Sequence, residues 1–112
     1  MKHDTIYLRH ILDAIEKIER YLANVDYETF SRNDMMTDAV VRELEIIGEA
    51  ARNLSTAFTE KHADIPWRRI KAMRNVLIHE YFGVSVKVVW DTCGSNLPQL
   101  KAFAQNVLAG ER

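Results

Sequence analysis

Apolar residues recur with a helical period over most of the chain. In the first segment they form one stripe, with charged residues between them, made of Ile11, Ile15, Ile18 and Leu22. This pattern predicts an amphipathic helix from about Asp4 to Ala23 that ends near Asn24. The following stretch, Val25 to Arg32, has no such stripe, and we interpret it as a connection.

A second, longer helix is predicted from about Asp34 to Leu54, with Asn33 or Asp34 as its N-cap. Apolar residues cover so much of its circumference that it needs packing partners on two sides. In a chain this short, one of those partners could be a second protomer. Gly48 in its middle costs about 1 kcal/mol relative to alanine, which indicates that another helix approaches closely there.

The two prolines indicate where later helices begin. Pro66 suits the first turn of a third helix, which we expect to end near Tyr81–Gly83. The stretch Val84–Trp90 is ambiguous because its valines also suit a strand. We assign a helix because a lone strand would find no partner. Asn96 is expected to cap a last helix with Pro98 in its first turn. The predicted fold is all-α, a small antiparallel helical bundle.

Length and composition are those of one ordinary globular domain, residues 1–112, with 47% hydrophobic and 28% charged residues. No apolar run approaches the roughly 20 residues that a membrane span needs, and no secretory leader is visible. The single cysteine, Cys93, excludes an internal disulfide, and we interpret it as a small buried apolar residue. We therefore expect a cytoplasmic protein without membrane association.

The net charge of −1 excludes a globally basic nucleic-acid binder. The stretch from Lys61 to His79 is nevertheless locally basic. Among its basic residues, Arg68, Arg69 and Lys71 are candidate RNA contacts, since a basic segment attracts a phosphate backbone. The alternative interpretation is an ordinary solvated helix face.

Known phosphate-loop, zinc-protease and nucleophile-elbow motifs are absent from the sequence. His3 and His10 are seven residues apart and share one helix face, but no third metal ligand is near them. We therefore predict no metal site and no cofactor.

Polar residues with catalytic chemistry gather near the predicted end of the third helix. Asn75 and His79 share a helix face, whereas Arg74 and His79 are about 140° apart on an ideal helix. Bringing these two together requires the reach of the arginine, a loosened helix or a second protomer. The imidazole of His79 can move protons near neutral pH, and the guanidinium of Arg74 can stabilise charge on a phosphate. Asn75 could orient the imidazole or hold a phosphate oxygen. Metal-independent RNA cleavage by 2′-hydroxyl attack needs these groups.

A purely structural role is the alternative for the same residues. Arg74 could pair with a carboxylate, and His79 could sit at the helix end because the negative end of the helix dipole favours it there.

Arg74 to Tyr81 matches the pattern RxxxxHxY, and three further blocks accompany it in order. The matching blocks are Arg42–Ala51, Ile65–Trp67, Met73–Gly83 and Val89–Thr92. With these blocks the chain resembles the HepT-like HEPN-domain ribonuclease toxins of type VII toxin–antitoxin modules. In these modules the toxin is paired with a minimal nucleotidyltransferase antitoxin.

The resemblance implies a HEPN helical bundle that forms a homodimer, with both copies of the motif in one cleft. It implies that Arg74 and His79 are the catalytic pair of a metal-independent endoribonuclease, with Asn75 as the supporting polar residue. It further implies that the cognate nucleotidyltransferase adenylylates (AMPylates) Tyr81 using ATP and so silences the site. Without the resemblance, Tyr81 would be interpreted as a packing residue. A non-catalytic helical module that binds a nucleotidyltransferase and helps present its substrate is the alternative function.

Overall fold

The computed structural model describes residues 2–79 and 85–110, including all of their side chains except those of residues 2 and 74–79. Within these residues the secondary structure is α-helical, without strands, so the predicted all-α class is confirmed. The helices in chain order are α1 (Lys2–Leu22), α2 (Tyr27–Arg32), α3 (Asp34–Arg52), α4 (Thr56–Lys61), α5 (Trp67–His79), α6 (Val86–Ser95) and α7 (Leu97–Gly110). The predicted single domain stays a prediction.

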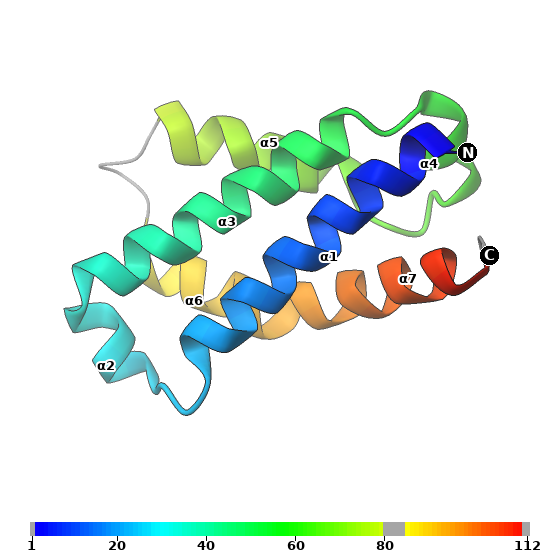
Figure 1. Ribbon diagram of the computed structural model, residues 1–112. Coiled ribbons are helices and arrows are strands. Elements are labelled where there is room, and N and C mark those ends of the chain that lie inside the picture. Colours follow the sequence, from blue (N-terminus) through cyan, green and yellow to red (C-terminus); the bar gives the residue numbers. More distant parts are fainter. Residues whose placement is uncertain (1, 80–84, 111–112) are drawn as a thin grey trace.

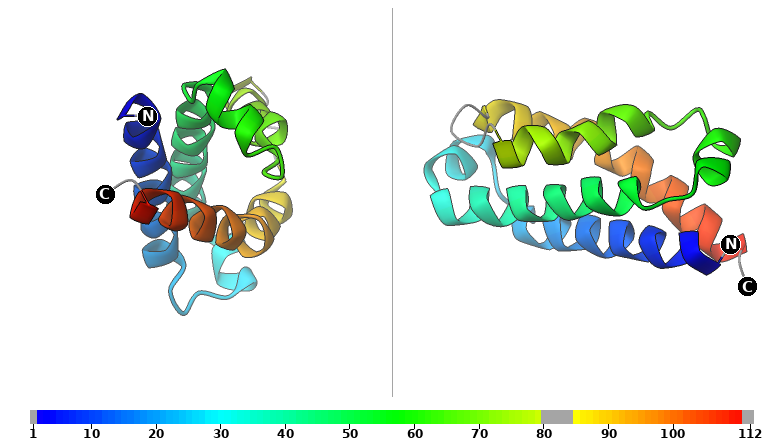
Figure 2. Two further views of the ribbon diagram at one scale, coloured as in Figure 1. Left: turned by 90° about the vertical axis from the view of Figure 1, so that its right-hand side faces the viewer. Right: turned by 90° about the horizontal axis from the view of Figure 1, so that it is seen from above.

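The helices form an antiparallel bundle in which α3 lies between α1 and α5 (Figures 1 and 2). Helix α7 packs across α1 and also against α6, and α2 contacts both α3 and α6. The start of α1 and the end of α7 lie at one end of the bundle, and α5 ends at the other (Figure 1). The predicted bundle architecture is therefore confirmed.

Capping residues explain several helix boundaries. Asn24, two residues after the end of α1, has a positive φ of 61°, a conformation that asparagine tolerates better than most residues. The side chain of Asn33 accepts a hydrogen bond from the backbone N–H of Met36 and caps α3, as predicted. Ser85 caps α6 in the same way through Val88, which confirms the helical assignment of that valine-rich segment.

The interpretation of residues 25–32 as a connection was wrong, because Tyr27–Arg32 forms α2. Asp26 caps this helix by accepting a hydrogen bond from Thr29, and Phe30 is fully buried. Helix α4 was not predicted either. Each of the two helices has only six residues, which is too short to show an apolar stripe in the sequence.

Helix α3 is the central element of the core. Its inward residues are almost completely buried, namely Val40, Leu44, Ile47 and Ala51. Gly48 is buried in the same helix. Helix α1 packs on one side of α3 and α5 on the other (Figure 2). Both packing partners of this helix therefore come from the same chain, so its wide apolar surface does not require a second protomer.

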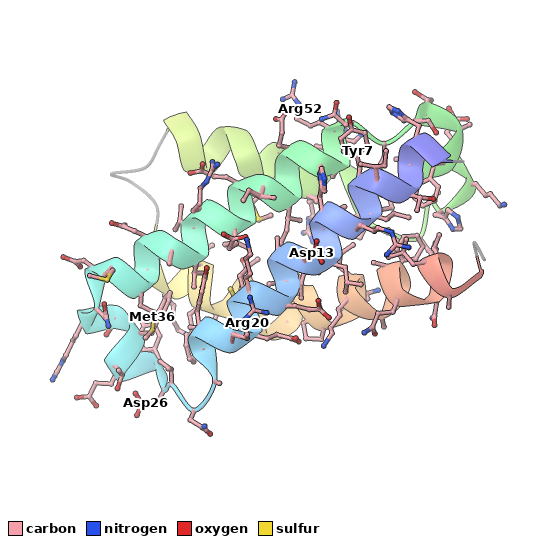
Figure 3. All side chains as sticks on the ribbon, in the orientation of Figure 1. Tyr7, Asp13, Arg20, Asp26, Met36 and Arg52 are labelled. Carbon is pink, nitrogen blue, oxygen red and sulfur yellow. The ribbon has the colours of Figure 1, made fainter. Side chains whose placement is uncertain are left out.

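The first turn of α1 is attached to the start of α4. Asp4 is only 3% exposed, and its carboxylate accepts hydrogen bonds from the backbone N–H of Ser55 at 2.7 Å and from its Oγ at 2.8 Å. Ser55 Oγ in turn accepts from the N–H of Phe58 at 3.1 Å and caps α4. This polar contact fixes the segment that leads into α5. By contrast, the acidic Asp13 and the basic Arg20 lie on the exposed side of α1 (Figure 3).

None of the described helices combines the length and apolarity that a membrane span requires.

Candidate functional site

The start of α5 is held by aromatic packing. Pro66 precedes the first residue of the helix, and its carbonyl accepts the hydrogen bond of Ile70 N–H at 3.1 Å. Trp67 is 6% exposed, lies against Phe103 with ring centroids 5.7 Å apart, and donates its Nε1–H to the carbonyl of His62. Trp67 is thus part of the core, and it fixes the rotation of α5 about its axis at this end.

Helix α5 remains α-helical through His79. Arg74 and His79 therefore stand on one uninterrupted helix, about 140° apart around its axis. A loosened helix before His79, one of the three ways of bringing them together, is thereby excluded. The structure places Arg74, Asn75 and His79 by their backbone only, and Tyr81 lies outside the described residues. That their side chains form one site stays a prediction.

The two faces of α5 differ in chemistry. Trp67 is buried and Ile70 half-buried, so this side of the first turns of α5 faces the core, and Arg74 follows Ile70 by four residues. On the other side, Arg68 and Ala72 are exposed. Asn75 and His79 follow at helical spacing and extend this second stripe, which we call the outer stripe of α5 (Arg68, Ala72, Asn75, His79).

The three basic residues predicted as RNA contacts occupy different surroundings. Arg68 is exposed on the outer stripe, Lys71 is half-buried, and Arg69 is turned toward α6 and α7, where it lines a pocket. The side chains of the three make no hydrogen bond or ion pair with another residue of the described ranges.

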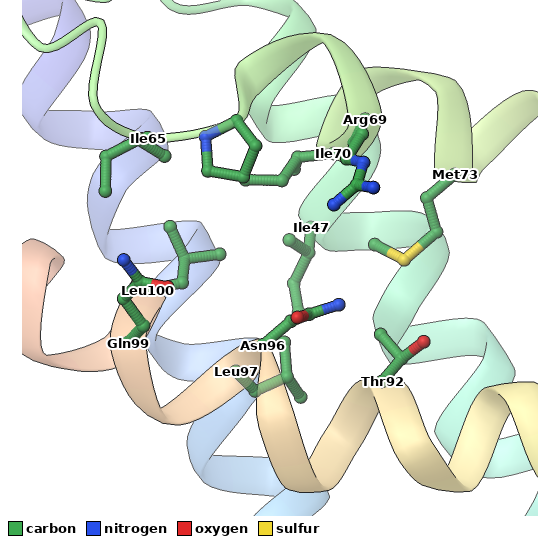
Figure 4. A pocket seen from close by; sticks show the side chains of 11 residues that line it. Ile47, Ile65, Arg69, Ile70, Met73, Thr92, Asn96, Leu97, Gln99 and Leu100 are labelled. Carbon is green, nitrogen blue, oxygen red and sulfur yellow. The ribbon is translucent and has the colours of Figure 1, made fainter.

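The pocket beside Arg69 has a volume of about 400 Å³ and lies between α5 and the junction of α6 and α7, with Ile47 of α3 at its base (Figure 4). Its walls are mainly apolar, and its polar groups are those of Arg69, Thr92, Asn96 and Gln99. Sequence reasoning missed this pocket. Four helices contribute to it, and no local pattern indicates that they converge.

The two histidines of α1 and the cysteine of α6 contact other parts of the fold. His3 and His10 flank the ring of Tyr7 at centroid distances of 5.1 and 5.7 Å, and His3 Nε2 lies 2.9 Å from the carbonyl oxygen of Asn53. Among the described side chains, those of residues 3–73 and 85–110, no three of His, Cys, Asp or Glu are grouped to hold a metal ion. Burial raises the pKa of the Cys93 thiol from 9.0 to about 12, so this cysteine is protonated at neutral pH and is a poor nucleophile.

The chain is therefore a small all-α bundle that carries an Arg-x4-His pattern on one continuous helix. The sequence profile described as "Ribonuclease HepT-like" matches residues 11–107, and the chain belongs to this family.

Curated relatives agree with the family assignment. A protein of Caldanaerobacter subterraneus subsp. tengcongensis, named "Putative RNase TTE0752", is 41% identical over 112 residues, which are all of both chains. "Probable ribonuclease HepT" of Thermococcus cleftensis is 45% identical over 95 residues, covering 85% of this chain and 86% of the relative. "Putative RNase MJ1380" of Methanocaldococcus jannaschii is 37% identical over 95 residues, covering 85% and 87%. No solved structure matches the chain.

Proposed function

We propose that the protein is a metal-independent endoribonuclease and the toxin component of a type VII toxin–antitoxin module. The observation that carries the proposal is the Arg74-x4-His79 pattern on the uninterrupted helix α5 of a chain in the ribonuclease HepT-like family. The names of its relatives, which describe them as RNases, support the same activity.

In the proposed reaction the 2′-oxygen of a ribose attacks the adjacent phosphorus atom, and the bond from phosphorus to the 5′-oxygen breaks. One proton leaves the 2′-hydroxyl and one reaches the departing 5′-oxygen. The imidazole of His79 is the group suited to move these protons near neutral pH. The guanidinium of Arg74 stabilises the charge that develops on the phosphate oxygens, and Asn75 orients the imidazole or holds a phosphate oxygen. The products are a 2′,3′-cyclic phosphate and a free 5′-hydroxyl.

A homodimer is part of the proposal. Because Arg74 and His79 occupy different faces of α5, a cleft shared by two copies of the helix would supply both groups to one phosphate without distorting either helix. The second copy would then complete the site rather than the hydrophobic core, since α1 and α5 of the same chain already cover α3.

The test of the catalytic pair is cleavage of RNA in the presence of EDTA. The purified protein is compared with Arg74→Ala, His79→Ala and, as a matched histidine control, His10→Ala on the exposed side of α1. Wild type and His10→Ala should cut equally, and loss of the general acid–base group in His79→Ala should slow cleavage by about 100-fold or more. Full cleavage by His79→Ala would refute the mechanism. A protein that binds a nucleotidyltransferase but never cuts RNA would instead be the non-catalytic module.

Control by a cognate nucleotidyltransferase at Tyr81 completes the proposal. The phenolic oxygen of Tyr81 would attack the α-phosphate of ATP, pyrophosphate would leave, and an AMP group would remain on the tyrosine. This bulky anion, two residues from His79, would repel and block an RNA phosphate.

Mass spectrometry after incubation with the transferase and Mg-ATP tests this modification. One adenylyl group should be gained by wild type and by Tyr27→Phe, the control on an exposed tyrosine, and none by Tyr81→Phe. Modification of Tyr81→Phe would contradict the assignment.

A further inference from the structure

The outer stripe of α5 places one basic residue in line with the polar pair Asn75 and His79. Its four members, Arg68, Ala72, Asn75 and His79, are spaced by four, three and four residues. At about 100° per residue, this spacing keeps all four within about 60° of one another around the helix axis. Arg68 and Ala72 are exposed, so the part of the stripe before Asn75 faces solvent.

Of the neighbouring basic residues, Arg69 lies off this stripe and Lys71 lies at its edge. Arg69 is also exposed, but it is rotated by about 100° from Arg68 and lines the pocket near α6 and α7. Lys71 is half-buried and lies about 60° from Arg68 and about 80° from His79 around the axis. Arg68 is exposed and lies within about 20° of both Asn75 and His79, so it is the residue of the three that best continues the line that they define.

We propose that Arg68 forms a second phosphate-binding subsite, which holds the RNA backbone several nucleotides away from the cleaved phosphodiester. This inference rests on the proposed ribonuclease function. The side chain of Arg68 makes no hydrogen bond or ion pair with another described residue, and a guanidinium can bind a phosphate with two parallel hydrogen bonds. The intervening Ala72 carries only a methyl group and leaves room for a strand along the helix surface.

The distance between the two subsites follows from helix geometry. Arg68 precedes His79 by eleven residues, which is about 16 Å along the axis at 1.5 Å per residue. A stacked strand that advances about 3.4 Å per nucleotide covers this distance in about five nucleotides, and an extended strand needs fewer. A dinucleotide that is bound at His79 is too short to reach Arg68.

The binding test uses a single-stranded RNA of about ten nucleotides with 2′-O-methyl groups, which prevent attack and keep the probe intact. Arg68→Gln should weaken binding several-fold and reduce the slope of log K against log salt concentration by about 0.7, the value for one phosphate contact on a single strand. Arg20→Gln removes the same charge from the exposed side of α1 and should keep the wild-type slope. Ala72→Glu changes the net charge equally, and should also weaken binding because its carboxylate lies on the outer stripe.

The cleavage test compares a dinucleotide with an unmodified RNA of about ten nucleotides. The ratio of kcat/KM for the long substrate to that for the dinucleotide should fall several-fold in Arg68→Gln, through KM, and should stay at the wild-type value in Arg20→Gln. Equal behaviour of Arg68→Gln and Arg20→Gln in both tests would overturn the subsite, while wild-type cleavage would leave the proposed function intact. If the wild type neither binds nor cuts RNA, the proposed function fails as well.

Discussion

Removing the carboxylate of Asp4 should destabilise the protein strongly, although the start of α1 and the last turn of α5 lie at opposite ends of the bundle. The buried carboxylate accepts two hydrogen bonds from Ser55, at 2.7 and 2.8 Å. A hydrogen bond to a charged group contributes about 1.5–3 kcal/mol, and a partner that loses it in a partly buried site is left unsatisfied. We therefore expect Asp4→Ala to lower the free energy of unfolding by about 3–4 kcal/mol.

Urea unfolding followed by tryptophan fluorescence measures this loss, since the chain has two tryptophans, Trp67 and Trp90. Asp13→Ala, an exposed position on the same helix, is the control and should shift the urea midpoint little. A double-mutant cycle with Ser55→Ala should give a coupling energy of about 1–3 kcal/mol, as expected for residues in direct contact. If the two substitutions are additive, or if Asp4→Ala behaves like Asp13→Ala, the proposed attachment of α1 to α4 is refuted.

Three further predictions concern packing, a surface ion pair and the thiol. Phe30→Ala should lower the free energy of unfolding by about 3–5 kcal/mol and alter the emission of Trp90, whose ring centroid is 5.2 Å away; a small change in either would mean that α2 is not anchored in this way. Lys101→Ala breaks the 2.8 Å ion pair with Glu19 and should shift the urea midpoint far less than Phe30→Ala, because exposed ion pairs contribute little. Cys93 should resist alkylation at pH 8 in the folded protein and react once unfolded. Because folding raises the pKa of the Cys93 thiol, the protonated thiol contributes stability below pH 9, and this contribution should be lost as the pH rises from about 9 to about 12. Urea unfolding curves recorded across that pH range test for the loss, and a constant free energy of unfolding would contradict it.

Long helices with apolar stripes and capping residues were predictable because their signals are local. Asn33 caps α3 as expected, and the ambiguous valine-rich segment is helical because Ser85 caps it and Val89 is buried. The six-residue helix α2 was not predictable, since one buried residue, Phe30, fixes it and a single residue shows no period.

The placement of Arg74, Asn75 and His79 on one helix was predictable because the helix period is a local signal, whereas their assignment to a common site stays a prediction. The surroundings of each basic residue of α5 were not predictable. Arg68 and Arg69 are adjacent in sequence, yet only the packing of α5 against α3 determines that Arg69 lies beside a pocket of α6 and α7. The sequence left the second packing partner of α3 open for the same reason, because nothing local in it indicates that α5 of the same chain covers this helix.

The start of α1 and the end of α7 lie at the same end of the bundle, and this has a practical consequence for labelling (Figure 1). An affinity handle or a fluorophore attached before α1 or after α7 projects from the side of the molecule remote from His79. Surface immobilisation through either label would therefore leave the last turn of α5 accessible to a large binding partner. A label introduced near Asp26, close to α2, would instead lie at the end of the bundle where α5 ends.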